Sequence, residues 1–493
     1  MMERNAVNAM MKRKALHWIG GEWVSSPSER ESIDPATGQA IGTFCDGGAE
    51  VAQAAIDAAV VAFRRGNWAT DPMLRTTALS HLADVYAARL GEVVDTLCLE
   101  NGKLRFEAAF EANFILRALR FAAGLAVQNY GRVLDPRPGQ QSMSIRQPVG
   151  VAGLIIPWNS PSYLCIRALA PALAAGCTAV VKMPSQSAQA AALTGEIIGS
   201  VPEIPKGVVN LFIESGSDGA RLLVDSPQVP VISFTGSSHT GRLIALAAAP
   251  RLKRVGLELG GKTPHVVFDD ADLNAVLPTI EKSSTIFAGQ FCMTGSRILV
   301  QRGIAEKLKA GLAERLARVR PGPAADPSSD MGPLIDKAAV ARVHGLVEDA
   351  IRAGAQPIVR GGPTTAAALA GGAFYHPTLL EVSEPSMPIV QAETFGPVQT
   401  VQTFDTEDEA IAMANDSEYG LSACVWSRDV DRPMRVARCL EAGLVSINSW
   451  ANVAVEFEEG GFKASGLGRL GGLGGIEDFL EYKQITQNYD GSH

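Results

Sequence analysis

Short apolar segments alternate with segments of helical pattern between residues 150 and 259. The apolar segments read VGVAGLIIP, TAVVKMP, GVVNLFI, VPVISF and RVGLEL, and one helix-length stretch separates each from the next. A strand that is apolar throughout must be covered on both faces, as happens in a parallel sheet with helices above and below it. The alternation therefore predicts an α/β fold with a doubly wound sheet of the dinucleotide-binding type.

The rest of the chain shows three further patterns. Small apolar residues recur three and four positions apart over residues 49–127, which is typical of helices. A second series of strands and helices runs from residue 263 to 448, and a glycine-rich tail follows it. Residues 130–150 are rich in Pro, Gly and polar side chains and then alternate like an edge strand, so we expect an arm or connector there.

Composition excludes several classes of protein. The chain is 46% hydrophobic and 19% charged, with a net charge of −8 and no block of like charges, which gives no indication of nucleic-acid binding. It has no apolar run of about 20 residues and no apolar core of a secretory signal, so we expect neither a membrane span nor a leader. Seven cysteines and seven histidines are scattered without CxxC or HxxxH pairs. This favours a reducing compartment, by default the cytoplasm, and no metal site.

Three residues are candidates for chemistry. Cys292 lies among small and polar residues in FAGQFCMTGSR, Glu258 lies beside a Gly-Gly turn, and Asn159 follows the first apolar strand. Ligands bind at the carboxyl edge of open α/β sheets, where Asn159 and Glu258 are expected. Taken singly, a structural thiol and a solvated glutamate are the commoner explanations of Cys292 and Glu258. The segment TGSSHTG is likewise either an ordinary turn or an anion site at a helix N-terminus.

Taken together, motifs along nearly the whole chain resemble those of the aldehyde dehydrogenase superfamily. Cys292 follows Glu258 at the spacing that this family has between its nucleophile and its base. Any one motif can arise by chance, but their shared order cannot. The motifs are, in chain order, IGGEWV, DPATG, PWNSP, APALAAGCTAVVK, PKGVVN, FTGSSHTG, ELGGKTP, GQFC, ETFGPV and GGFKASGLGR.

The resemblance implies how the chain is divided. We expect a Rossmann-type cofactor-binding domain over residues 14–125 and 149–260 and a catalytic α/β domain over residues 261–460. A small β-structured oligomerisation arm and tail are expected over residues 126–148 and 478–493. The resemblance implies a homodimer or a homotetramer, and the sequence does not decide between them. It implies no nucleic-acid or membrane partner.

The resemblance also implies NAD(P)-dependent oxidation of an aldehyde to a carboxylic acid. Cys292 would attack the aldehyde carbon to form a thiohemiacetal, and hydride transfer would leave a thioester. The side chain of Asn159 and the backbone N–H of Cys292 would stabilise the oxyanion, and Glu258 would activate water as general base. Because Glu258 is present, we expect hydrolysis rather than acyl transfer to coenzyme A.

The family's cofactor-binding positions correspond to a set of residues in this chain that would bind NAD or NADP. They are Gly216 beside the adenine, Trp158 and Lys182 around the adenosine ribose, Gly236 and Ser237 at the helix N-terminus that faces the pyrophosphate, Glu393 on the nicotinamide ribose and Phe395 packed beside it.

Two departures from the family pattern bear on specificity. Many members have a glutamate, which repels a 2′-phosphate, where this chain has Ser185. We expect NADP to be tolerated beside NAD, the alternative being a neutral exchange with NAD still preferred. Arg167 and Ala168 stand where a common family pattern has a tryptophan and a lysine, and Glu459 stands where an aromatic pocket residue is frequent. Either Arg167 recognises a substrate, or the two side chains pair with each other.

A moderately polar pocket follows from these two residues, and it favours a semialdehyde acid or an aromatic aldehyde. Two other functions stay open on the same scaffold, a cofactor-independent thiol esterase and a catalytically silent structural protein. The silent protein would be expected to lack Cys292, Glu258 or Asn159, all of which are present. Neither alternative produces an absorbance change at 340 nm when an aldehyde is added.

Overall fold

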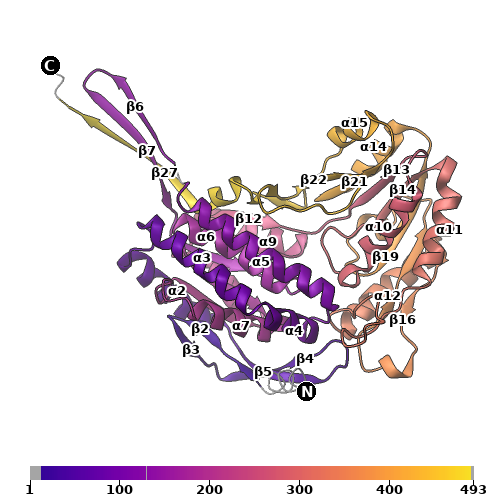
Figure 1. The fold of residues 1–493 in the computed structure, drawn as a ribbon, viewed down its shortest axis with the longest axis horizontal. Helices are drawn as coiled ribbons and strands as arrows, with labels where there is room; N and C mark the ends of the chain where they lie inside the picture. The colour runs from indigo at the N-terminus through magenta and orange to yellow at the C-terminus, as the bar shows by residue number, and fades with distance from the viewer. Residues whose placement is uncertain (1–12, 129, 490–493) are drawn as a thin grey trace.

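The computed structural model describes residues 13–128 and 130–489 (Figure 1). The first twelve residues, on which the expectation about a leader rests, lie outside the described residues, as do residue 129 and the last four residues of the predicted tail. Within the described ranges, no helix combines the length and the hydropathy that are needed to cross a membrane.

Eight strands form the larger of two main sheets, in the order β25–β12–β11–β8–β9–β10–β2–β3. The five central strands are parallel, as predicted, whereas β2, β3 and β25 add antiparallel edges. These strands are β2 (His17–Ile19), β3 (Glu22–Val24), β8 (Val151–Ile155), β9 (Thr178–Pro184), β10 (Val209–Glu214), β11 (Val231–Thr235), β12 (Arg254–Glu258) and β25 (Gly466–Leu467).

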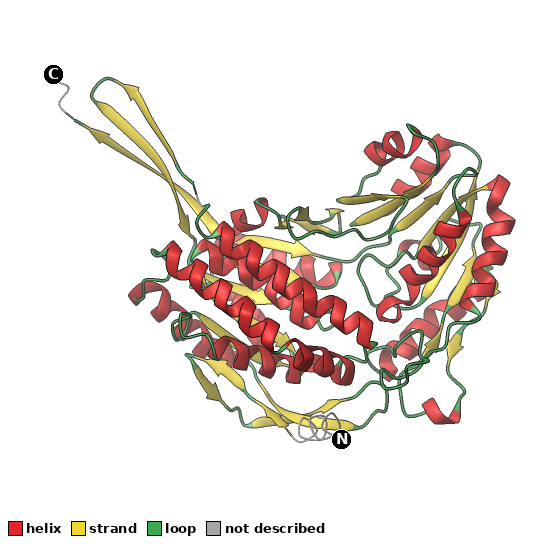
Figure 2. Ribbon diagram, in the orientation of Figure 1, coloured by secondary structure: helices red, strands yellow, loops and turns green. Residues whose placement is uncertain are grey.

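Helices cover both faces of this sheet, and Figure 2 shows them in red around the strands. Successive side chains of a strand point to opposite faces. In β8, Ala152 and Leu154 pack in a core with α3, α5, α6 and α7, whereas Val151 and Ile155 pack with α2, α8 and α9. The helices are α2 (Ala49–Arg65), α3 (Pro72–Ala88), α5 (Arg105–Leu125), α6 (Pro161–Ala175), α7 (Ala188–Gly199), α8 (Asp218–Asp225) and α9 (Ser238–Ala248). The burial of both side-chain sets explains why these strands are apolar throughout.

A second sheet of seven strands has the order β15–β18–β19–β14–β13–β21–β22, with only β15 antiparallel. Its strands are β13 (Pro264–Val267), β14 (Arg297–Gln301), β15 (Gln356–Val359), β18 (Thr378–Glu381), β19 (Val398–Phe404), β21 (Ser422–Trp426) and β22 (Leu444–Ile447). Its helices include α10 (Leu273–Thr285), α11 (Ala305–Leu316), α12 (Lys337–Arg352), α14 (Glu407–Asn415) and α15 (Arg432–Cys439). The predicted α/β fold class is therefore confirmed.

A three-stranded arm projects from the body of the molecule (Figure 1). It consists of β6 (Arg132–Arg137), β7 (Gln140–Pro148) and β27 (Leu480–Asn488), and β27 pairs antiparallel with β7 over its whole length. The arm thus joins two segments that are far apart in the sequence. Its side chains are mostly exposed, including the apolar residues Val133 and Leu134.

The topology of the first sheet gathers polar side chains at one edge. The strands β8, β11 and β12 are neighbours and run parallel, so their carboxyl ends meet at the same edge. Asn159 follows the end of β8, Thr235 ends β11 and Glu258 ends β12. The fold therefore brings together side chains that lie far apart in the sequence.

Candidate active site

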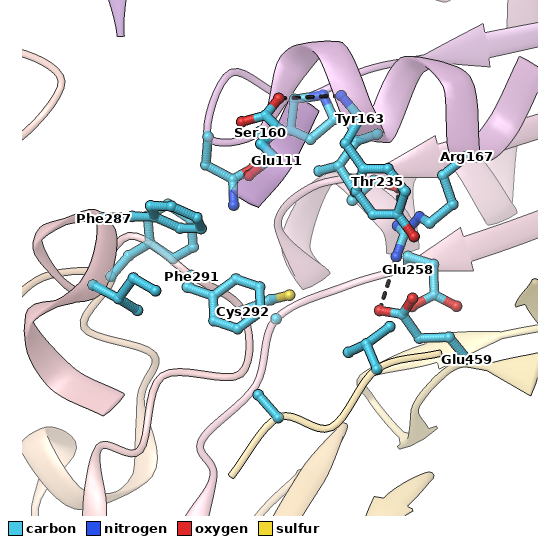
Figure 3. A pocket seen from close by; sticks show the side chains of 18 of the residues that line it. Glu111, Ser160, Tyr163, Arg167, Thr235, Glu258, Phe287, Phe291, Cys292 and Glu459 are labelled. Atoms are coloured by element: carbon cyan, nitrogen blue, oxygen red, sulfur yellow. Dashed lines mark hydrogen bonds and ion pairs between the residues drawn. The ribbon is translucent and has the colours of Figure 1, made fainter. Parts of the chain in front are cut away.

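One cavity of about 740 Å³ contains all three residues that the sequence singles out for chemistry. Asn159 and Glu258 reach it from the edge of the first sheet, and Cys292 reaches it from the loop before β14 of the second sheet. In Figure 3 the sulfur of Cys292 points toward the side of the cavity where Glu258, Arg167 and Glu459 lie. The predicted meeting of a thiol, an amide and a carboxyl group is thus present in the structure.

The loop that carries Cys292 has an unusual backbone conformation. In the short 3₁₀ segment η3 (Ile286–Gly289), Phe287 and Ala288 both have a φ of 52°, in the left-handed region. Non-glycine residues rarely adopt this region, and such strain persists only where the surroundings hold it. Gly289 follows with a φ of 71°, and a Cβ there would lie 2.4 Å from a neighbouring backbone atom. The position of Cys292 is therefore set by the packing around η3.

The side chain of Asn159 links its own turn to the loop of the thiol. Its Nδ2 donates a hydrogen bond of 3.1 Å to the backbone carbonyl of Gln290. The second N–H of this amide has no partner among the described residues, so it is available to an oxygen atom in the cavity. Gln290, which the sequence did not single out, is held in turn: its Nε2 donates to the carbonyl of Phe287 and its Oε1 accepts from the N–H of Ile335.

Glu258 is a buried carboxyl group without a hydrogen-bond partner on its Oε1 atom among the described residues. Glu258 is only 5% exposed, and its Oε1 accepts no hydrogen bond within the described part of the chain. Burial raises the pKa of Glu258 to about 8, although the positive charge of Arg167 acts in the opposite direction. A carboxyl group with such a pKa can exchange a proton with a reacting group near neutral pH.

Arg167 and Glu459 form an ion pair inside the same cavity (Figure 3). Nη1 of Arg167 lies 2.9 Å from Oε1 of Glu459, and the two side chains are only 6% and 10% exposed. Nη2 of Arg167 also donates to Oγ1 of Thr235 at 3.1 Å. Burial lowers the pKa of Arg167, but the facing carboxyl groups of Glu459 and Glu258 raise it by more, so its pKa lies above the ordinary value. A substrate carboxylate would therefore compete with Glu459 for Arg167.

The same pair acts on the thiol. Burial raises the pKa of Cys292 well above its ordinary range, the charge of Glu459 raises it further, and Arg167 lowers it. The thiol is therefore protonated at neutral pH, and it becomes a nucleophile only when a base accepts its proton. Glu258, whose carboxyl group faces the same hollow, is the base at hand.

Part of the predicted cofactor set lines the cavity. The rings of Trp158 and Phe395 meet edge to face with centroids 5.5 Å apart. The side chain of Ser237 caps the N-terminus of α9, which presents N–H groups to an anion. Oε1 of Glu393 accepts from the N–H of Gly261 at 3.1 Å, and burial raises the pKa of Glu393 to about 7. The predicted cofactor residues among the cavity lining are Trp158, Gly236, Ser237, Glu393 and Phe395.

The other predicted cofactor residues lie beyond the cavity lining, along the same sheet edge. Lys182 is on β9, Ser185 follows that strand directly, and Gly216 follows β10. Because β9 pairs parallel with β8 and β10 pairs parallel with β9, the carboxyl ends of both strands continue the edge on which Asn159 lies. Burial lowers the pKa of Lys182, and the nearby charge of Glu214 partly offsets this.

An aromatic wall of the cavity was not predicted from the sequence. Three of its rings lie on one face of α5, because Phe106, Phe110 and Phe114 are spaced four residues apart. The run RFEAAFEANF carries this signal, but a helical aromatic stripe is more often core than binding site. Besides Trp158 and Phe395, the aromatic rings in the lining are those of Phe106, Phe110, Phe114, Tyr163, Phe287, Phe291 and Trp450.

Comparisons with known proteins agree with this geometry. The model of the aldehyde dehydrogenase family matches residues 23–485. The 2-aminomuconic semialdehyde dehydrogenase of Danio rerio is 39% identical over 476 residues, which cover 95% of this chain and 97% of that protein. The NADP(+) succinate-semialdehyde dehydrogenase of Saccharomyces cerevisiae is 35% identical, with 95% and 94% covered. A crystal structure of betaine aldehyde dehydrogenase from Staphylococcus aureus in complex with NAD+ has a TM-score of 0.96 and 35% identity, with 99% and 98% covered.

The substitution E459Q is expected to accelerate alkylation of Cys292 by iodoacetamide at pH 7. Glu459 is the largest of the charges that raise the pKa of Cys292, so without it the charge of Arg167 favours the thiolate more strongly. Each unit by which the pKa falls raises the thiolate fraction about tenfold. The rate is followed by mass spectrometry of the peptide that contains Cys292, because other cysteines also react.

E456Q is the matched control, since Glu456 forms an exposed ion pair with Arg117. This variant removes the same charge at the surface and should leave the alkylation rate of Cys292 unchanged. An alkylation rate for E459Q at or below that of the wild type would contradict the electrostatic role of Glu459.

Proposed function

The chain belongs to the aldehyde dehydrogenase family, which oxidises aldehydes with NAD(P) by means of a cysteine nucleophile, and we propose that Cys292, Glu258 and Asn159 carry out this reaction. The observation that supports the assignment is that one cavity contains a thiol, a buried carboxyl group and an amide with one N–H free to donate. Each group has the property that its step requires.

The first step is attack of Cys292 on the aldehyde carbon, with Glu258 accepting the proton of the thiol. Negative charge then develops on the aldehyde oxygen. The free N–H of the Asn159 amide and the backbone N–H of Cys292 donate to it, and such preorganised donors each contribute roughly 10²–10³ in rate. A bound NAD(P)+ would supply the acceptor for the hydride that leaves the carbon, and a thioester remains on Cys292. Once Glu258 has released the thiol proton to solvent, it takes a proton from water. That water attacks the thioester, the sulfur of Cys292 leaves, and the carboxylic acid is released.

The residues at the sheet edge fit a dinucleotide. The N-terminus of α9 at Gly236 and Ser237 suits the pyrophosphate, and the carboxyl group of Glu393 suits a ribose hydroxyl. Trp158 and Phe395 supply flat apolar surfaces beside them. At the adenosine end, Lys182 offers a cation and Ser185 a hydroxyl without a repelling carboxylate, which suits NADP as well as NAD.

For the substrate, the structure favours an aromatic aldehyde. The charge of Arg167 is already paired with Glu459, so it is not free to bind a carboxylate without loss of that pair. The aromatic wall offers ring faces and edges on which a second ring packs favourably. A semialdehyde acid is the second candidate, because Arg167 lies in the cavity and related enzymes act on semialdehydes.

Three further assignments accompany this function. We propose residues 14–125 and 149–260 as the cofactor-binding domain and residues 261–460 as the catalytic domain. In support, all strands of the first sheet except β25 lie in the first two ranges, and all strands of the second sheet lie in the third. The arm of β6, β7 and β27 is proposed to bind another copy of the chain, because its apolar side chains are exposed. All seven cysteines are free thiols, which is consistent with a reducing compartment such as the cytoplasm.

We expect E258Q to impair both the attack of the thiol and the hydrolysis of the thioester. The amide can accept a proton neither from Cys292 nor from water, so the first burst of NADH and the steady-state rate should each fall by at least about 100-fold. A stopped-flow record at 340 nm measures the burst and the steady state separately. In the wild type the steady-state rate should rise with pH through about 8, because Glu258 is a base only when deprotonated. Steady-state turnover by E258Q at the wild-type rate would exclude this role.

The cofactor assignment predicts that NAD and NADP are both used. The ratio of the two kcat/KM values should lie within about 100-fold, equivalent to about 2.7 kcal/mol. The variant S185E places a carboxylate near the 2′-phosphate and should lower kcat/KM for NADP by at least about tenfold while sparing NAD. S185A is the control without the charge. A wild-type preference for NAD above the 100-fold limit would show that Ser185 is a neutral exchange.

An aldehyde panel tests the substrate class. Benzaldehyde should have the highest kcat/KM of a set that also contains succinic semialdehyde, betaine aldehyde and acetaldehyde. E459Q should raise the value for succinic semialdehyde relative to benzaldehyde by at least about tenfold, because Arg167 is then free to bind a carboxylate. A wild-type preference for succinic semialdehyde, unchanged in E459Q, would instead mean that Arg167 already binds substrate beside Glu459.

A further inference from the structure

Three charged side chains are buried at the start of α5, outside the set that the reaction uses directly. Lys103, Glu107 and Glu111 are 2%, 1% and 1% exposed. Glu107 and Glu111 are four residues apart on α5 and therefore share one face of the helix, whereas Lys103 lies just before the helix begins. Buried charges are costly unless paired and hydrogen-bonded, so their partners are informative. We call these three residues the α5 cluster.

Glu107 holds the loop of the thiol. Its Oε1 accepts a hydrogen bond of 2.7 Å from the backbone N–H of Phe287, one of the two residues of η3 in the left-handed conformation. Its Oε2 accepts from the N–H of Leu104 at 2.8 Å, which caps α5. The carboxylate therefore fastens the strained loop of the second sheet to a helix that packs on the first.

Glu111 holds the turn that carries Asn159. Its Oε1 accepts from the backbone N–H groups of Ser162 and Tyr163, at 3.0 and 3.1 Å. Figure 3 shows the carboxylate of Glu111 directed at the first turn of α6. These N–H groups belong to the free N-terminus of that helix, where a carboxylate is favoured. Through Glu111, α5 thereby fixes the turn of residues 157–160 at the point where it enters α6.

Lys103 joins the two attachments. Its ammonium group forms a buried ion pair with Glu111 and a hydrogen bond of 3.1 Å with Oγ of Ser160. It also lies over the ring of Phe287, 4.2 Å from the centroid. One cation thus contacts both the turn of Asn159 and the loop of Cys292.

We propose that the α5 cluster is a positioning device for the oxyanion site, and that it sets the distance between the Asn159 amide and the backbone N–H of Cys292. This inference rests on the proposed roles of Asn159 and Cys292. The two donors come from segments that belong to different sheets, and the direct link between them is the bond from Asn159 to Gln290. The cluster supplies the second, rigid connection through α5.

The consequence is kinetic rather than only structural. Donors act on the oxyanion only when they lie at hydrogen-bond distance from its position in the transition state. A displacement of about 1 Å by a distant mutation can cost about 100-fold in rate. Loss of the cluster should therefore lower kcat by a larger factor than it raises KM for the aldehyde.

The first test compares E107L with E107Q in the full-length enzyme. Leucine removes both acceptors, and kcat should fall by about 100-fold. Glutamine keeps one oxygen to accept from Phe287, and its kcat should stay close to that of the wild type. The alkylation rate of Cys292 by iodoacetamide is measured in parallel, because it requires the sulfur but no oxyanion donor. The diagnostic quantity is the ratio of kcat to this alkylation rate.

A second variant covers the case in which E107L does not fold. K103M/E111Q replaces the buried ion pair by two neutral side chains, and the glutamine oxygen can still accept from Ser162 and Tyr163. The contacts of Lys103 with Ser160 and Phe287 are lost, so the ratio of kcat to alkylation rate should fall by at least about tenfold.

The matched control is E100L. Glu100 ends α4 (Leu90–Glu100), is equally buried, and accepts from the backbone N–H groups of Gln189 and Ala190 at 2.8 and 3.0 Å. Its loss should lower the melting temperature as E107L does, but leave the ratio of kcat to alkylation rate unchanged. A fall in this ratio for E100L would show that general destabilisation explains the effect.

N159A separates the inference from the function on which it rests. If N159A lowers kcat by roughly 10²–10³ while E107L and K103M/E111Q keep the wild-type ratio, the α5 cluster is not a positioning device. If N159A itself keeps wild-type kcat, the proposed oxyanion donor is wrong, whatever the cluster variants do. Loss in N159A, E107L and K103M/E111Q, with recovery in E107Q, is the result expected.

Discussion

The cavity depends on a balance of buried charge. Glu258, Arg167 and Glu459 are all nearly removed from water, where an uncompensated charge costs several kcal/mol or more. Arg167 and Glu459 compensate each other, so the pair adds little net charge beside Glu258. Burial then dominates the behaviour of Glu258 and raises its pKa. A lone arginine in this place would pull the pKa of Glu258 down and make it a weaker base.

The sheet and the two strand-end residues were predictable because they follow from local pattern and general topology. A segment that is apolar at every position has to be covered on both faces, and the strands of the first sheet are. Parallel strands then present their carboxyl ends at one edge, which places Asn159 and Glu258 together. The prediction of the thiol needed more, since Cys292 belongs to the other sheet and only family motifs connected it to the site.

The remaining features of the site depend on contacts between segments that are distant in the sequence, and no local pattern in the sequence encodes such contacts. Arg167 and Glu459 lie in different thirds of the chain, and both pairing and substrate recognition were compatible with their identities. The structure shows the pair. The left-handed conformation of Phe287 and Ala288 is similarly invisible in sequence, because neither residue type favours it. Tertiary contacts such as that of Glu107 hold it.

The helix α5 connects substrate and chemistry. Phe110 follows Glu107 by three residues, and Phe114 follows Glu111 by the same offset, all within α5. Positions three apart are about 60° apart around a helix, so the rings and the charges occupy adjacent faces. One face lines the cavity and the other holds the loops of Asn159 and Cys292. Because a helix is rigid over this length, α5 positions both the rings that would contact the body of an aldehyde and the loops that carry the donors for its oxygen. A shift of α5 would therefore disturb both together, which explains why charges are buried there despite their cost.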